Sequence, residues 1–219
     1  MRELRFGRKG AGKGQAKALL VFLHGYGANG ADLLGLADAM GPHLSGVGFL
    51  APDAPEACSS GGGGLQWFPV PWIDGSPQAA ADAGLDAATQ DLNGFLDARL
   101  VDEGLTPDRL MLLGFSQGAM MAMHVAPRRA QPVAGIVAIS GRLLRPELLA
   151  SEAVVRPPVL LIHGDQDPVV PFGDMARAGD HLVAAGFQTF GHVMEGTGHG
   201  IAPDGLGVAL QFIKERLAV

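Results

Sequence analysis

Short apolar runs alternate with longer amphipathic stretches along most of this chain of 219 residues. Each run holds five to eight residues rich in Val, Ile, Leu or Phe, without a strict alternation of apolar and polar positions. Strands that are buried on both faces have this composition. We therefore expect strands at Ala18–Leu23, Val47–Ala51, Leu110–Phe115, Gly135–Ser140, Val159–His163 and, from a weaker pattern, Phe187–Met194.

The amphipathic stretches between the runs predict helices. In the longest stretch, apolar residues such as Leu85, Leu92 and Leu96 recur at helical spacing. Strands that alternate with helices favour an α/β fold, in which a mostly parallel central sheet carries helices on both faces. The expected helices are Ala31–Met40, Ala79–Glu103, Gln117–Ala126, Asp174–Ala185 and Gly205–Leu217.

The chain carries no internal repeat and no linker, so we expect one domain over residues 1–219. Residues 1–17 hold six of the sixteen basic residues and predict a solvated basic arm or an edge segment. The tract 52–78, which includes the glycine-rich residues 59–64, fits no regular element. A loop of that length is often functional, and parallel sheets bind ligands in the loops that follow their strands.

Charge and cysteine content exclude several functional classes. The net charge of −6 argues against a nucleic-acid binder, which usually carries a basic stripe. No apolar run approaches the ~20 residues of a membrane span, so we expect no stable membrane insertion, and we find no signal-peptide pattern. The single cysteine, Cys58, cannot form an internal disulfide, so we expect a cytoplasmic protein.

Residues 114–118 read Gly-Phe-Ser-Gln-Gly and lie between an apolar run and a helical stretch. A G-x-S-x-G pattern between a strand and a helix is typical of a nucleophilic serine on a sharp turn. Small residues at 114 and 118 let the strand and helix approach, and the helix dipole favours negative charge near the serine. We expect Ser116 to be the nucleophile; the alternative is a chance match in a glycine-rich chain.

A serine nucleophile needs a general base, which an acid must orient. The loop after the run Val159–His163 offers two aspartates. We favour Asp167, which lies further into the loop and directly before a proline. Asp165 is the alternative, although we expect it to hydrogen-bond within its own turn.

Seven histidines are candidates for the base. His163 and His192 lie in expected strands and His124 lies in an expected helix, so we expect them to be structural. His199 lies in a glycine-rich loop between the last expected strand and the terminal helix. That is where the base belongs when the three groups follow in the chain order serine, acid, histidine.

Acyl transfer also needs N–H donors for the oxyanion. The backbone N–H of Gln117 follows from the geometry of the turn. A second donor is expected from the loop after an early strand, and residues 23–27, Leu-His-Gly-Tyr-Gly, form that loop. An ordinary tight turn is the alternative.

Five segments, in this order, resemble the phospholipase/carboxylesterase family of α/β-hydrolases, which includes the acyl-protein thioesterases. They are L-H-G-Y-G-A-N-G at 23–30, P-D-A-P at 52–55, G-F-S-Q-G at 114–118, H-G-D-Q-D-P-V-V-P at 163–171 and G-H-G-I at 198–201. The resemblance implies an α/β-hydrolase fold and a catalytic triad of Ser116, Asp167 and His199. It also implies an oxyanion hole formed by the backbone N–H groups of Leu23 and Gln117.

Two departures from the family pattern are visible. Ala119 stands where many members have a second glycine, and its side chain is small enough for the turn. The tract from Cys58 to Trp72 differs from the thioesterase-like members, which leaves the substrate open.

The segment between Ser116 and Asp167 has no room for a lid domain, so we expect an open site roofed by the 52–78 loop. An apolar acyl pocket favours esters of short- to medium-chain acids over charged substrates. Packing within the loop is the alternative for the two tryptophans. The side chains expected around the acyl group are Leu65, Trp67, Phe68, Val70, Trp72, Val169 and Phe172.

These observations predict a serine carboxylesterase that hydrolyses short- to medium-chain esters through an acyl-enzyme. We expect no metal and no cofactor. The alternatives are an acyl-protein thioesterase or lysophospholipase with the same triad, or a binding protein on an inactive hydrolase scaffold. The expected partner is a small-molecule ester, and a homodimer is the assembly that we consider.

Overall fold

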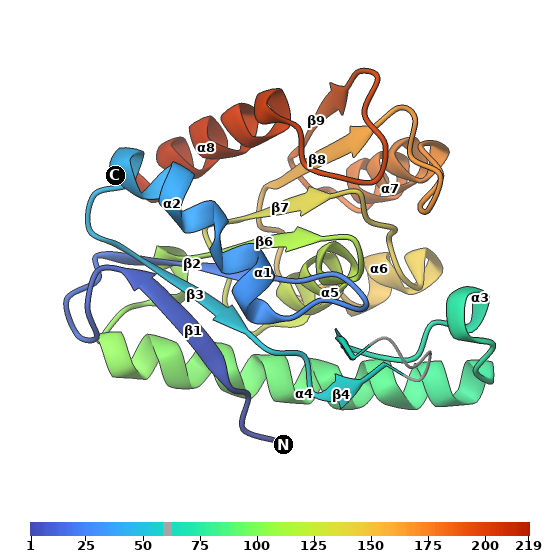
Figure 1. The fold of residues 1–219 in the computed structure, drawn as a ribbon, viewed down its shortest axis with the longest axis horizontal. Helices are drawn as coiled ribbons and strands as arrows, with labels where there is room; N and C mark the ends of the chain where they lie inside the picture. The colour runs from blue at the N-terminus through green and yellow to red at the C-terminus, as the bar shows by residue number, and fades with distance from the viewer. Residues whose placement is uncertain (59–62) are drawn as a thin grey trace.

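A seven-stranded sheet forms the centre of the computed structural model, which describes residues 1–58 and 63–219 (Figure 1). Its strands are β1 (Phe6–Gly10), β2 (Ala18–Leu23), β3 (Val47–Pro52), β6 (Leu110–Phe115), β7 (Gly135–Ile139), β8 (Val159–Gly164) and β9 (Thr189–Met194). They lie in the order β1-β3-β2-β6-β7-β8-β9, and within this sheet only β1 runs antiparallel to its neighbour. The mostly parallel sheet expected from the sequence is confirmed.

Burial explains why these segments form strands. Every residue of β2, β3, β7 and β8 is buried, and only the last residue of β6 is partly exposed. Strands enclosed on both faces can carry apolar residues at every position, because neither face meets water. The unalternating runs in the sequence therefore correspond to the central strands.

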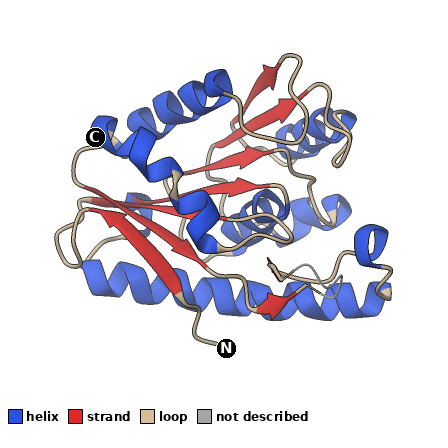
Figure 2. Cartoon of the chain, viewed as in Figure 1, coloured by secondary structure: helices blue, strands red, loops and turns tan. Residues whose placement is uncertain are grey.

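Helices cover both faces of the sheet, as Figure 2 shows. On one face, α1 (Gly30–Leu34), α2 (Leu36–Met40) and α8 (Pro203–Leu217) enclose one apolar cluster. On the other face, α4 (Gln78–Glu103), α5 (Gln117–Val125), α6 (Pro146–Glu152) and α7 (Gly173–Ala184) enclose a second cluster. Single 3-10 turns lie at Gly41–His43, Pro107–Arg109 and Ala126–Arg128.

The structure differs from the sequence expectations in several short elements. The tract 52–78 contains β4 (Glu56–Ala57), β5 (Leu65–Gln66) and the one-turn helix α3 (Pro71–Asp74), where no regular element was expected. Residues 59–62 of the expected glycine-rich stretch lie outside the described residues. The expected helix 31–40 is interrupted at Gly35, and α6 was not expected. Elements of two to seven residues are too short for a periodic pattern.

The N-terminal segment resolves the alternative left by its composition. Residues 6–10 form β1, which pairs with β3 at the edge of the sheet. Arg2 donates to the buried carboxylate of Asp91 on α4, and Leu4 is buried. Residues 6–10 of this basic segment are therefore an edge segment of the sheet, while Arg5 and Lys13 remain largely exposed.

Between Ser116 and Asp167 the chain forms α5, β7, α6 and β8. The absence of a lid domain from this part of the chain follows directly. Among the described residues, we find no helix that is both long and apolar enough to cross a membrane.

Substitution of a core leucine on α4 tests the importance of this packing. Leu92 has no exposed surface, whereas Val101 on the same helix is 81% exposed. Leu92→Ala leaves a cavity under the sheet and is expected to lower the free energy of unfolding by about 2–5 kcal/mol. Val101→Ala, the matched control, should change it by less than about 0.5 kcal/mol. Urea unfolding measures both, and equal effects would contradict this packing.

Candidate active site

Ser116 lies on a sharp turn between β6 and α5. Its backbone has φ 53° and ψ −117°, a conformation that L-residues rarely adopt and that strains the chain. Its N–H donates to the carbonyl of Ile139 at 2.8 Å. A Cβ on Gly118 would collide with the carbonyl of Leu23, and a Cβ on Gly114 would collide with Gly118. Glycine at both positions is therefore what lets the turn form.

The three residues expected to form a triad meet at this turn. The Ser116 hydroxyl lies 3.0 Å from Nε2 of His199, and Nδ1 of His199 lies 2.8 Å from Oδ2 of Asp167. The ring of Phe115 packs against the imidazole, with centroids 4.9 Å apart. Residues that are far apart in the sequence thus form one continuous hydrogen-bonded chain.

The carboxylate of Asp167 is fully enclosed by hydrogen-bond donors. Burial acts to raise the pKa of this carboxyl, but hydrogen bonds from His199 and from the backbone N–H groups of Val170 and Val169 outweigh it. The two backbone donors lie 2.9 Å and 2.8 Å from Oδ1. The net result is a pKa below the ordinary value, so Asp167 is ionised at neutral pH.

His163, which the sequence indicated to be structural, lies beside the same carboxylate. Its Nε2 is 3.0 Å from the carbonyl of Val170 and 3.2 Å from Oδ2 of Asp167. Both neighbours are acceptors, so Nε2 must carry the proton. The sequence does not reveal this contact. His163 lies inside a strand, and the carboxylate of Asp167 reaches it only through the turn after β8.

Asp165, the alternative acid, has a different partner from the one expected. Its Oδ1 accepts from the N–H of Gly196 at 2.7 Å. The expectation of a hydrogen bond within its own turn is therefore wrong. Asp165 instead holds the loop that carries His199.

The two expected oxyanion donors differ in their surroundings. Gln117 follows Ser116 directly at the start of α5. Leu23 is the last residue of β2 and lies opposite Gly114 of β6, so it precedes the loop that faces Ser116. That loop begins after Leu23, and a Cβ on Gly25 would lie 3.2 Å from the Cβ of Ser116.

The buried imidazole of His24 makes hydrogen-bond contacts with the backbone of this loop and of residue 54. Its Nδ1 lies 2.8 Å from the carbonyl of Gly25, and its Nε2 accepts from the N–H of Ala54 at 2.9 Å. Burial lowers the pKa of His24, against weaker opposing effects from the Gly25 carbonyl and nearby carboxylates. The imidazole is therefore neutral and fixes the backbone next to Ser116.

The side chain of Gln117 fixes the 52–78 loop. Its Oε1 accepts from the N–H of Trp67 at 2.9 Å, and its Nε2 donates to the carbonyl of Phe68 at 2.7 Å. Both hydrogen bonds are buried. One residue thus links the turn of Ser116 to the loop expected to roof the site.

The residues expected around the acyl group fall into two sets. Trp67 is completely buried and donates from its indole to the carbonyl of His24, and Phe68 is also buried. Leu65 is partly buried against the core. Trp72 and Val169 are about half exposed, at 51% and 48%. Trp72 and Val169 therefore offer more free apolar surface to a substrate than Trp67 and Phe68.

The remaining chemistry of the site is limited. His124 is buried within α5, and burial together with Arg128 and Arg145 lowers its pKa to about 4. Within residues 1–58 and 63–219, no three or more His, Cys, Asp or Glu side chains form a group that could hold a metal ion.

The chain is similar to known hydrolases in both sequence and structure. The sequence profile of the phospholipase/carboxylesterase family matches residues 10–217. Acyl-protein thioesterase 1 of Neurospora crassa is 30% identical over 91% of this chain and 87% of its own length. Acyl-protein thioesterase 1 of Saccharomyces cerevisiae is 30% identical over 93% of this chain and 94% of its own. The crystal structure of esterase PE8 superposes with a TM-score of 0.92, at 39% identity over 99% of this chain and 100% of that one.

Removing the Gln117 side chain tests its role in fixing the loop. Gln117→Ala leaves the Trp67 N–H without its acceptor, so amide hydrogen exchange at Trp67 should accelerate. The free energy of unfolding should fall by about 1–3 kcal/mol, because two buried hydrogen bonds are lost. Gln211→Ala on the surface of α8 is the control and should change neither quantity. Unchanged exchange at Trp67 in Gln117→Ala would contradict this role.

Proposed function

The chain belongs to the phospholipase/carboxylesterase family of hydrolases, and from this premise we propose that it is a serine carboxylesterase. It cleaves esters of short- to medium-chain acids through an acyl-enzyme on Ser116. The observation that carries the proposal is the hydrogen-bonded chain from the Ser116 hydroxyl through His199 to Asp167.

The carboxylate decides which nitrogen of His199 holds the proton. Asp167 is ionised and can only accept, so Nδ1 of His199 must carry the hydrogen in that 2.8 Å contact. Nε2 is then unprotonated and can accept the hydroxyl proton of Ser116 across 3.0 Å. Asp167 therefore selects the tautomer that a general base requires.

The reaction follows from this arrangement in two halves. The oxygen of Ser116 attacks the ester carbonyl while its proton moves to Nε2 of His199. The tetrahedral intermediate collapses, the ester C–O bond breaks, and His199 gives the proton to the departing alcohol. Water then attacks the acyl-enzyme with His199 as base, which releases the acid and restores Ser116.

The oxyanion of each intermediate needs backbone donors. The N–H of Gln117 is the first. We place the second in the loop that follows Leu23, the last residue of β2, because Gly25 of that loop packs on Ser116.

The acyl group is bounded by exposed apolar side chains in this proposal. Trp72, Val169 and Phe172 expose between 38% and 51% of their surface, which suits them to contact a substrate. Leu65, Phe68 and Trp67 are less accessible. For Trp67, complete burial and its hydrogen bond to His24 support a role in holding the loop instead.

The names of the fungal relatives favour a second candidate. Both relatives described above are called acyl-protein thioesterase 1, and a thioester is attacked by the same serine chemistry. A lysophospholipase would also use it. Rates on matched oxygen esters, thioesters and lysolipids separate these three, because the triad is common to all of them. The intact hydrogen-bonded chain argues against a binding protein on an inactive scaffold.

The cellular compartment, the partner, the domain extent and the assembly of the enzyme are also proposals. The single cysteine favours the cytoplasm, and a small-molecule ester is the proposed partner. We keep residues 1–219 as one domain, which the continuous seven-stranded sheet supports. A homodimer is tested by sedimentation.

Removal of the nucleophile gives the first test. Hydrolysis of p-nitrophenyl esters from acetate to decanoate should peak at a short or medium acyl chain in the wild type. Ser116→Ala should lose about 10⁴-fold or more in kcat, because no hydroxyl remains to form the acyl-enzyme. Ser151→Ala, a control at an exposed position on α6, should keep the wild-type rate. If Ser116→Ala hydrolysed the esters at a rate comparable to that of the wild type, the serine mechanism would be excluded.

Substitution of His163 tests its contact with Asp167. His163→Met removes the N–H beside Oδ2, so more negative charge remains on the carboxylate and protonation of His199 is favoured. Activity should then be lost at a higher pH than in the wild type as the solution is acidified. At neutral pH, kcat/KM should fall about tenfold. The measurement is the pH profile of kcat/KM.

Two variants complete the His163 test. His163→Gln can still donate from its amide and should restore most of the wild-type profile. His43→Met, at an exposed position, is the control and should change nothing. A fall in rate in His163→Met without any movement of the acid limb would mean that His163 only packs.

A further inference from the structure

The segment that follows β7 runs along the edge of the active site. A Cβ on Gly141 would lie 3.3 Å from the carbonyl oxygen of Ser116 and 2.6 Å from the Cβ of Ala119. Gly141 therefore packs on the turn that carries the nucleophile. The next residue, Arg142, starts from a backbone position adjacent to that turn.

The guanidinium of Arg142 is held in a fixed position. Its Nε donates to Oδ2 of Asp174 at 2.7 Å, and Asp174 is buried. Its central carbon lies 4.9 Å from the centroid of the Trp72 ring, in a cation–π contact. Arg142 is thus clamped between α7 and the loop expected to roof the site.

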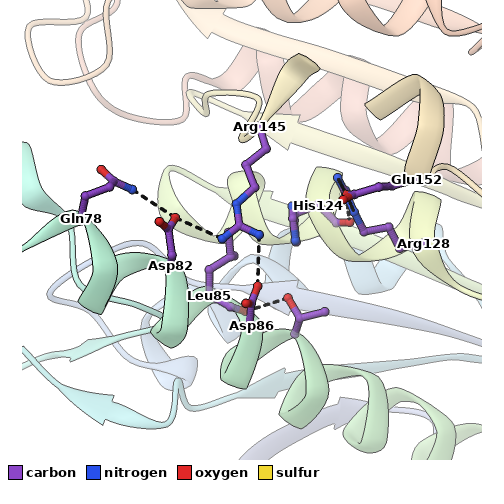
Figure 3. Close-up of polar contacts among 9 residues, drawn as sticks. Gln78, Asp82, Leu85, Asp86, His124, Arg128, Arg145 and Glu152 are labelled. Carbon is purple, nitrogen blue, oxygen red and sulfur yellow. Dashed lines mark hydrogen bonds and ion pairs between the residues drawn. The ribbon is translucent and has the colours of Figure 1, made fainter. Parts of the chain in front are cut away.

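The segment is fixed at its other end as well. Arg145 reaches across to α4, where it donates to Asp82 and Asp86 at 3.1 Å each (Figure 3). Two carboxylates therefore neutralise the charge of Arg145. Arg142 has no comparable neutralisation, and this difference separates the two arginines.

Positive charge exceeds negative charge around Arg142. Arg142 and Arg177 share the single carboxylate of Asp174, so two cations face one anion. In the part of the chain that the structure describes, the two terminal nitrogens of Arg142 make no hydrogen bond. A cavity of about 390 Å³ is lined by Arg142, Leu143, Pro146, Asp174, Arg177, Ala178 and His181. Unused planar donors beside a cavity are suited to a carboxylate or phosphate group.

We propose that Arg142 is a specificity-determining residue that binds an anionic group on the ester substrate. This inference rests on the proposed function, because the bound ester must also reach Ser116. The preferred substrates are then acidic esters, in which an apolar part passes Trp72 and an anion meets the Arg142 guanidinium. That revises the expectation of a preference for uncharged substrates, which considered only the apolar residues of the loop.

Matched acidic and neutral esters test the proposal on each side of the scissile bond. The acyl arm compares monoethyl succinate, glutarate and adipate with ethyl butanoate, pentanoate and hexanoate. The alcohol arm compares O-butanoylglycolate with O-butanoylglycolamide. The readout in both arms is the ratio of kcat/KM for the acidic ester to that for its neutral match, measured by pH-stat titration.

The wild type should favour the acidic ester in one arm, and that arm identifies the part of the substrate that carries the anion. Arg142→Gln should lower the ratio about tenfold or more, because a charged hydrogen-bonding partner is lost. Arg142→Lys keeps the charge without the planar fork and should restore part of the ratio. Raising the salt concentration should also lower the wild-type ratio.

Arg5→Gln is the matched control. It removes the same charge from a side chain that is largely exposed. Arg5 directly precedes β1, the edge strand that β3, β2 and β6 separate from β7. Its ratio should equal that of the wild type. A fall in Arg5→Gln equal to that in Arg142→Gln would mean that net charge alone sets the preference, which would overturn the proposal.

The remaining outcomes separate this inference from the proposed function. If Arg142→Gln leaves the ratio unchanged in both arms, or slows acidic and neutral esters equally, Arg142 does not recognise an anion. Labelling of Ser116 by a fluorophosphonate reports the esterase machinery independently. A wild type that neither labels nor hydrolyses any ester overturns the proposed function, and the anion site with it.

Discussion

The whole site depends on one backbone constraint, the close approach of α5 to β2 and β6 at the turn of Ser116. The turn needs a positive φ at Ser116 and glycine at 114 and 118, because any Cβ there would meet backbone carbonyls. The parallel sheet supplies the rest, since the loops after β2, β7 and β8 open at the same edge as this turn. The arrangement of the sheet therefore brings the residues of the site together.

The sequence predicts most of this architecture for two physical reasons. Buried parallel strands leave unbroken apolar runs, and glycine must appear where backbones touch, so both features are local and readable. Ser116, Asp167 and His199 each lie in a glycine- or proline-marked loop after such a run. Elements that lack a period, such as α3 and α6, cannot be predicted in this way, because a few residues carry no repeating pattern.

Contacts between distant segments are what the sequence cannot reveal. His163 lies within a strand, and only the turn after β8 brings Asp167 back beside it. The position of Leu23 opposite Gly114 depends on the pairing of β2 with β6, which is a matter of strand order. The contact of Arg142 with Trp72 and Asp174 joins three separate segments, and no pattern of spacing in one chain predicts it.

The central claim is that an acyl group passes through Ser116, and trapping that intermediate tests it most directly. The protein would be mixed with a p-nitrophenyl ester, quenched in acid within the first turnover, and digested for peptide mass spectrometry. We expect a burst of about one p-nitrophenolate per chain and an acyl group on the peptide that contains Ser116. An acyl group on Cys58 or on another residue, or turnover without any covalent adduct, would contradict it.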